Sequence, residues 1–126
     1  MEFTYQDKRI CTFAISPRTL EPAQYWRNIE KVGQWCGDYQ FTGPLLFTGN
    51  DTFVEPWVAA QTVIDRYGVS PLVAVNPVYM HPFSVAKMIS SYAYAFEKQV
   101  FLNMVTGTNG TALRRVFDKN GHEKPG

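Results

Sequence analysis

The sequence predicts an α/β fold in which parallel strands alternate with helices. Short apolar runs bounded by turn residues alternate with stretches that repeat apolar residues at helical spacing. Strand starts at Leu45, Leu72 and Val100 recur about every 27 to 28 residues, the length of a βαβ unit. Strands that are apolar throughout are typical of parallel sheets. Right-handed crossovers then give either an open doubly wound sheet or part of a (β/α) barrel.

The first unit is a strand followed by an amphipathic helix. The run RICTFAIS, Arg9 to Ser16, is apolar and β-branched, and a proline closes it. The helix follows in EPAQYWRNIEKVGQWC, where Glu21 and Pro22 suit a helix start and Gly37 suits a stop. Its predicted buried face contains Tyr25, Ile29, Val32 and Cys36.

The same unit then repeats along the chain. PLLFTG and PLVAVNP are the second and third predicted strands, and KQVFLNMVTGT is the fourth. VEPWVAAQTVIDRYG, closed by Gly68, and PFSVAKMISSYAYAFE are the helices between them. In the last helix we expect Tyr92, Tyr94 and Phe96 in the core. Residues 109–126 have low apolar content and are predicted to be a loop or a disordered terminus.

Composition excludes several classes of protein. The chain has 126 residues, enough for one compact domain, and its net charge of +1 argues against a nucleic-acid or anionic-membrane binder. No apolar run is long enough to cross a bilayer, and nothing at the start resembles a signal peptide. Two cysteines make no disulfide framework, which favours a cytoplasmic location, and no spacing resembles a zinc site.

The carboxyl ends of the predicted strands carry small polar and amide groups, and parallel α/β folds bind ligands at these ends. Such groups suit hydrogen bonding to a planar heteroaromatic ligand, and none is a strong base. Asn and Thr also form ordinary turns, so a purely structural role stays open at each position. The four ends are Ser16-Pro17, Thr48-Gly49-Asn50, Asn76-Pro77 and Asn103 to Gly107.

Other candidate sites are weaker. TGTNG is rich in glycine but lacks the Lys-Ser/Thr of a phosphate-binding loop. His81 precedes a proline at a predicted helix start, where a cap or loop role is favoured over catalysis. Glu55 suits the start of the second helix, and Cys36 suits packing rather than nucleophilic attack.

Several segments together carry a family resemblance. FVEPWVAAQTVIDRYGVSPLVAVNPVYMHPFSVAKMISSYAYAF and QVFLNMVTG resemble the N-terminal half of bacterial luciferase-like flavin-dependent monooxygenases, and most of all the alkanesulfonate monooxygenase branch. The resemblance runs roughly from Arg9 to Gly107. It implies that residues 1–108 form about half of a (β/α)₈ TIM-type barrel that uses reduced FMN and O₂ to oxygenate a small organic substrate. A separate flavin reductase would supply the FMN, and a deazaflavin is the alternative cofactor.

The resemblance also implies roles for particular residues. Asn103 and Thr106 match fourth-strand residues that approach the flavin ring, and Asn76 matches the third-strand position beside it. Phe47 and Thr48 match the second-strand end, nearer the substrate. The alkanesulfonate branch usually has arginine where this chain has Asn76, which argues against a sulfonate substrate. No side chain is assigned a catalytic role, because the flavin carries the chemistry.

Length sets the remaining expectations. A full barrel needs about 250 residues, so the chain is expected to be incomplete and inactive alone. Its uncovered apolar face should favour a homo-oligomer or pairing with a complementary barrel half. The alternative is a non-catalytic barrel module that binds flavin weakly or pairs with a homologous subunit. An unrelated flavodoxin-like domain is disfavoured, because SPRTLEP has no glycine in the first strand-to-helix turn.

Overall fold

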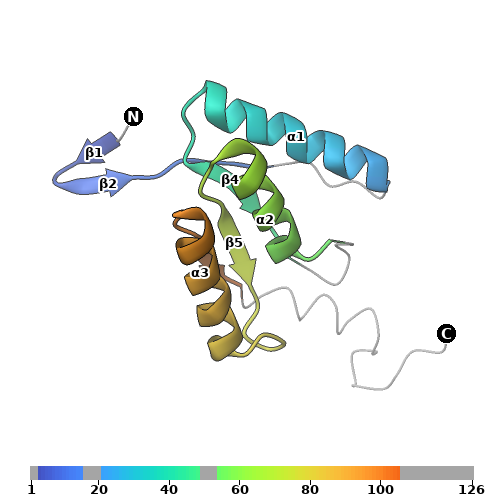
Figure 1. The fold of residues 1–126 in the computed structure, drawn as a ribbon. Helices are drawn as coiled ribbons and strands as arrows, with labels where there is room; N and C mark the ends of the chain where they lie inside the picture. Colours follow the sequence, from blue (N-terminus) through green and yellow to red (C-terminus); the bar gives the residue numbers. More distant parts are fainter. Residues whose placement is uncertain (1–2, 16–20, 49–53, 106–126) are drawn as a thin grey trace, which may run out of the picture.

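The computed structural model describes residues 3–15, 21–48 and 54–105 (Figure 1). Strands and helices alternate after a short N-terminal hairpin, which confirms the α/β class. Among the described residues, no helix is both long enough and apolar enough to span a bilayer. In chain order the elements are β1 (Phe3–Tyr5), β2 (Lys8–Ile10), β3 (Phe13–Ile15), α1 (Pro22–Asp38), β4 (Gly43–Leu46), α2 (Pro56–Tyr67), β5 (Leu72–Val75), α3 (Pro82–Phe96) and β6 (Phe101–Met104).

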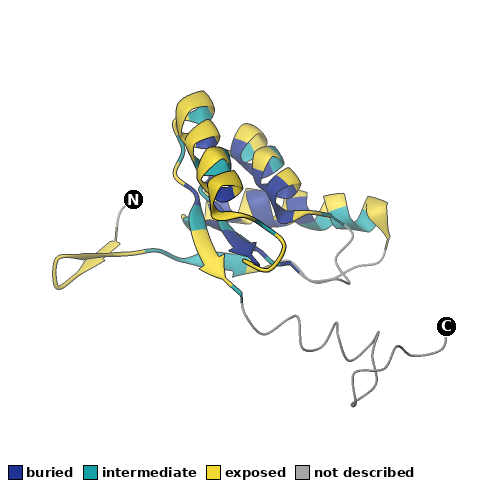
Figure 2. Cartoon of the chain, turned by 90° about the horizontal axis from the view of Figure 1, so that it is seen from below, coloured by how far each residue is buried: buried dark blue, intermediate teal, exposed yellow. Residues whose placement is uncertain are grey.

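Four strands form one parallel sheet whose spatial order is the chain order, β3-β4-β5-β6. Each connection therefore moves one strand further in the same direction. Connections of one hand that all advance the same way place their helices on the same face of the sheet. Figure 2 shows the three helices together on one side, and no described helix covers the other side.

The core lies between the helices and the sheet. Trp57 of α2 stacks on Tyr92 of α3 with ring centroids 5.9 Å apart. The Tyr92 hydroxyl donates to the Trp57 carbonyl at 2.8 Å, and Trp57 Nε1 donates to Met80 Sδ at 3.2 Å. These bonds satisfy the polar atoms of two large buried rings and fix α3 against α2. From the sheet, the core receives Leu46, Val73 and Val75, and Val100 joins them from just before β6.

The opposite face of the sheet is apolar but uncovered within the described chain. Paired residues of parallel strands point to the same side, and side chains alternate along each strand. Since Val73 and Val75 face the helices, Leu72 and Ala74 face away, and their register partners face away with them. We call this surface the open face. Its strand residues are Phe13, Ile15, Gly43, Leu45, Leu72, Ala74, Phe101 and Asn103.

The N-terminal segment differs from the prediction of one strand over Arg9 to Ser16. β1 and β2 pair as an antiparallel hairpin in which Tyr5 lies opposite Lys8, and β3 begins only at Phe13. The two turn residues, Gln6 and Asp7, both have positive φ, at 49° and 61°. That is the backbone of a type I′ turn, which usually contains Asn-Gly. The turn therefore left no recognisable signal in the sequence.

Two expectations about the helices were wrong. α1 does not stop at Gly37 but continues to Asp38, and the chain takes a left-handed conformation only at Gln40. Tyr94 is not in the core, since it is 92% exposed. It lies two residues after the buried Tyr92, which on a helix is the opposite side. The stop of α2 at Gly68, with φ of 63°, is confirmed.

Gly33 and Gly37, both in α1, should respond oppositely to alanine. A Cβ at Gly33 would collide with the Tyr67 ring of α2, whereas nothing lies within 4 Å of one at Gly37. We expect Gly33→Ala to lower the free energy of unfolding by about 1–3 kcal/mol through overpacking. Gly37→Ala should be neutral or stabilising by up to about 1 kcal/mol, because alanine favours helix. Urea denaturation of both variants tests this, and equal effects would contradict the packing of α1 on α2.

Candidate functional site

Three residues make up a row at the carboxyl end of the sheet: Phe47 just after β4, Ala74 in β5 and Asn103 in β6. Ala74 pairs with Asn103, and Phe47 follows Leu46, whose partner in β5 is Val73. Ala74 is 2% exposed, whereas Asn103 is exposed. The row therefore has a small apolar centre, an aromatic ring on one side and a solvent-facing amide on the other. A flat ligand could contact the half-buried Phe47 ring and hydrogen-bond to Asn103.

Asn76 lies at the same end of the sheet and is 2% exposed. Its Oδ1 accepts a hydrogen bond from the backbone N–H of Val78 at 2.9 Å, so the side chain shapes the turn that follows β5. Parallel-strand spacing puts its Cα about 8 Å from that of Asn103. The structure thus brings these two predicted flavin-contacting residues to one edge, with Asn76 holding a loop and Asn103 facing solvent.

Thr48 differs from its neighbour Phe47. It is 6% exposed, and its hydroxyl is hydrogen-bonded to the Tyr79 hydroxyl at 2.5 Å. Both residues follow Leu46, the last residue of β4, and Phe47 is half-buried whereas Thr48 is buried. The two predicted substrate-side residues therefore differ in how far they are exposed. Thr48 connects the end of β4 to the loop between β5 and α3.

Some sequence predictions fall on residues that the structure does not describe. Thr106, predicted to approach the flavin, and the predicted tail 109–126 lie outside the described residues, so both stay predictions. Conversely, Ala74 and Tyr79 were not singled out from the sequence. Alternation within β5 could have identified Ala74 as the small residue between two site positions. Nothing in the sequence marks Tyr79, because its contact with Thr48 spans 31 residues.

The weaker candidates have structural roles in the described residues. His81 is the N-cap of α3, and its Nδ1 accepts from the backbone N–H of Phe83 at 3.1 Å, which confirms the cap. Burial raises the pKa of the Cys36 thiol, opposed in part by the Ala14 backbone, and disfavours the reactive thiolate. Desolvation likewise raises the pKa of Glu55 at the start of α2, and the nearby Trp57 backbone opposes the shift.

This arrangement can bind and orient a ligand through apolar contact and amide hydrogen bonds. Within the described ranges, no group of three or more His, Cys, Asp or Glu residues could hold a metal ion. The row of Phe47, Ala74 and Asn103 also contains no titratable side chain. A reaction at this edge would therefore draw its reactive group from a bound cofactor or from other parts of the protein.

Comparison with known proteins connects this chain to an oxygenase. It is 34% identical over 86 residues to the 4-(γ-L-glutamylamino)butanoyl-[BtrI acyl-carrier protein] monooxygenase BtrO of Niallia circulans. The matched segment is 67% of this chain and 25% of the relative, so the chain spans about a quarter of that protein's length. No protein-family model and no solved structure matches the chain. The chain is thus similar to part of a monooxygenase.

The Thr48–Tyr79 bond should contribute measurably to stability. Tyr79→Phe leaves the buried Thr48 hydroxyl without this partner, which typically costs about 1 kcal/mol. The matched control is Tyr94→Phe, since that residue is 92% exposed. Urea denaturation should show a lower midpoint for Tyr79→Phe and an unchanged midpoint for Tyr94→Phe. Equal midpoints for the two variants would show that the bond does not hold the loop.

Proposed function

We propose that this chain forms the first four strands of a (β/α)₈ barrel in a reduced-FMN-dependent monooxygenase. The observation that carries the proposal is the 34% identity to a monooxygenase over 86 residues. The sheet supports it, because a (β/α)₈ barrel also has consecutive parallel strands with all of the helices on the outer face. The open face would then line the barrel interior, and its carboxyl edge would be the active-site end.

The residues at that edge fit an isoalloxazine ring. Phe47 offers a half-buried aromatic surface, the exposed Asn103 can donate to and accept from the ring's polar edge, and Ala74 beside Asn103 adds no bulky side chain. Asn76 would act indirectly, by holding the turn after β5. When bound, reduced FMN would supply the electrons that activate O₂. The protein's share is to orient the ring and exclude water.

The substrate we propose is a small organic acyl compound without a free acidic group at this edge. The exposed Asn103 offers an amide, which can hydrogen-bond to neutral carbonyl and amide groups. The relative's name describes an acyl group attached to a carrier protein, and this attachment removes the charge of the butanoyl carboxylate, whereas the γ-glutamyl group at the other end keeps its α-carboxylate. A carrier-bound acyl substrate is therefore our first choice for this chain as well.

A chimera gives the sharpest test. Replacing the aligned segment of the BtrO relative with this chain should retain FMN binding and substrate-dependent O₂ consumption. Asn103→Ala in the chimera should weaken FMN binding about tenfold, the typical effect of one lost hydrogen bond. Asn28→Ala on α1, which covers the opposite face, is the matched amide control and should leave binding unchanged.

Other outcomes separate the alternatives. FMN binding by the isolated chain and the chimera, with no O₂ consumption by either, would favour the non-catalytic module. Failure of both to bind FMN or a deazaflavin would contradict the flavin proposal. Equal losses from Asn103→Ala and Asn28→Ala would remove Asn103 from the site while leaving the barrel assignment intact.

A further inference from the structure

The N-terminal hairpin contacts the last strand of the sheet, far from it in sequence. Arg9 Nη2 donates to Gln99 Oε1 at 3.0 Å, across 90 residues of chain. The same guanidinium lies over the Phe101 ring, with Cζ 5.4 Å from the centroid. Arg9 thus makes a hydrogen bond to Gln99, just before β6, and a cation–π contact to Phe101, the first residue of β6.

Phe101 in turn meets Phe13 across the open face. Their ring centroids are 5.3 Å apart in an edge-to-face arrangement. Yet β3 and β6 are the two outer strands of the four. In a flat sheet three strand spacings and a two-residue offset would separate their Cα atoms by about 16 Å. The rings can touch only because the sheet curves and the open face is concave.

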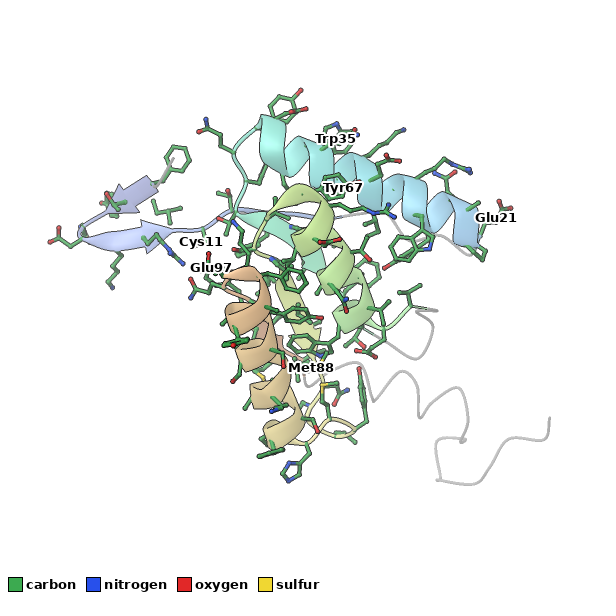
Figure 3. All side chains as sticks on the ribbon, viewed as in Figure 1. Cys11, Glu21, Trp35, Tyr67, Met88 and Glu97 are labelled. Carbon is green, nitrogen blue, oxygen red and sulfur yellow. The ribbon has the colours of Figure 1, made fainter. Side chains whose placement is uncertain are left out.

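The hairpin has little else to hold it. All six of its strand residues are exposed, and a two-stranded hairpin is at best marginally stable alone. Alternation along β2 puts Lys8 on the other hairpin face from Arg9. Lys8 therefore carries the same charge on the same strand without contacting Phe101. In Figure 1 the hairpin extends sideways from the sheet, and Figure 3 shows its side chains projecting from that arm.

We propose that Arg9 is a positioning residue that fastens the hairpin to β6. Through Phe101 and Phe13, the contact holds the two outer strands at the curvature that makes the open face concave. Asn103 lies two residues beyond Phe101 on the same face. Arg9 therefore determines the position of the Asn103 amide relative to β3, although Arg9 itself lies at the opposite, amino end of the sheet.

Hydrogen exchange of single amides tests this without any ligand. The Phe101 N–H is bonded to the Pro71 carbonyl at 2.9 Å, and the Val105 N–H to the Val75 carbonyl at 2.8 Å, so both report on β6. In the full chain, Arg9→Ala should accelerate exchange at these two amides about five- to thirtyfold. The Ser70 N–H, bonded to the Thr42 carbonyl at 3.0 Å, reports on β4–β5 and should not change.

Three further variants make the result specific. Lys8→Ala removes one positive charge from the same strand and should leave all three amides unchanged. Arg9→Lys keeps the charge but loses the planar guanidinium, so its acceleration should be smaller than that of Arg9→Ala. If Arg9→Ala does not fold, Gln99→Leu removes only the acceptor and should accelerate the β6 amides by a smaller factor.

Three results would overturn the proposal: no acceleration at Phe101, equal acceleration at Ser70, or the same acceleration in Lys8→Ala. A second readout rests on the proposed function: Arg9→Ala in the chimera should weaken FMN binding, and Lys8→Ala should not. If the exchange result holds and no variant affects FMN binding, the role of Arg9 in fastening the hairpin to β6 is supported, and only its effect on the candidate site is excluded. If the parent chimera binds no flavin, the flavin proposal fails, whereas the proposed role of Arg9 is still tested by the exchange measurement.

Discussion

The structure depends on the same-direction order of its four parallel strands. Because each crossover advances by one strand, all three helices accumulate on one face, and the sheet receives a core on that side alone. A doubly wound sheet reverses direction and covers both faces. Here no reversal occurs in the described chain, so the other face is left apolar and open. The positions of Ala74 and Asn103 follow from that asymmetry.

An apolar concave face is costly to leave in water, at about 25 cal/mol for each Å² that could be covered. If further strands closed the curved sheet into a barrel, the open face would be buried and the edge strands would be paired. The polar groups then remain at one end, where Asn76 shapes a turn and Asn103 faces solvent. We propose that this chain contributes one wall of a larger site, and its similarity to a quarter of a monooxygenase supports that proposal.

The sequence predicted the βα units well, because apolar runs and helical periodicity repeat at a regular interval. It also predicted a cap or loop role for His81, which depends only on local spacing before a proline, and the structure shows the cap. What it could not predict depends on contacts between distant segments. The hairpin uses positive φ at Gln6 and Asp7, which no turn motif marks. Thr48 has a hydrogen-bond partner in Tyr79, 31 residues further along the chain, and no local pattern indicates that contact.

The curvature of the sheet is the central claim, and a nuclear Overhauser effect between two rings tests it most directly. With aromatic ¹³C labelling of phenylalanine, ring protons of Phe13 and Phe101 should show a cross-peak, because their centroids lie 5.3 Å apart. A flat sheet would hold the two Cα atoms about 16 Å apart, and no cross-peak would form. Its absence in the folded chain would contradict the concave face and the barrel wall derived from it.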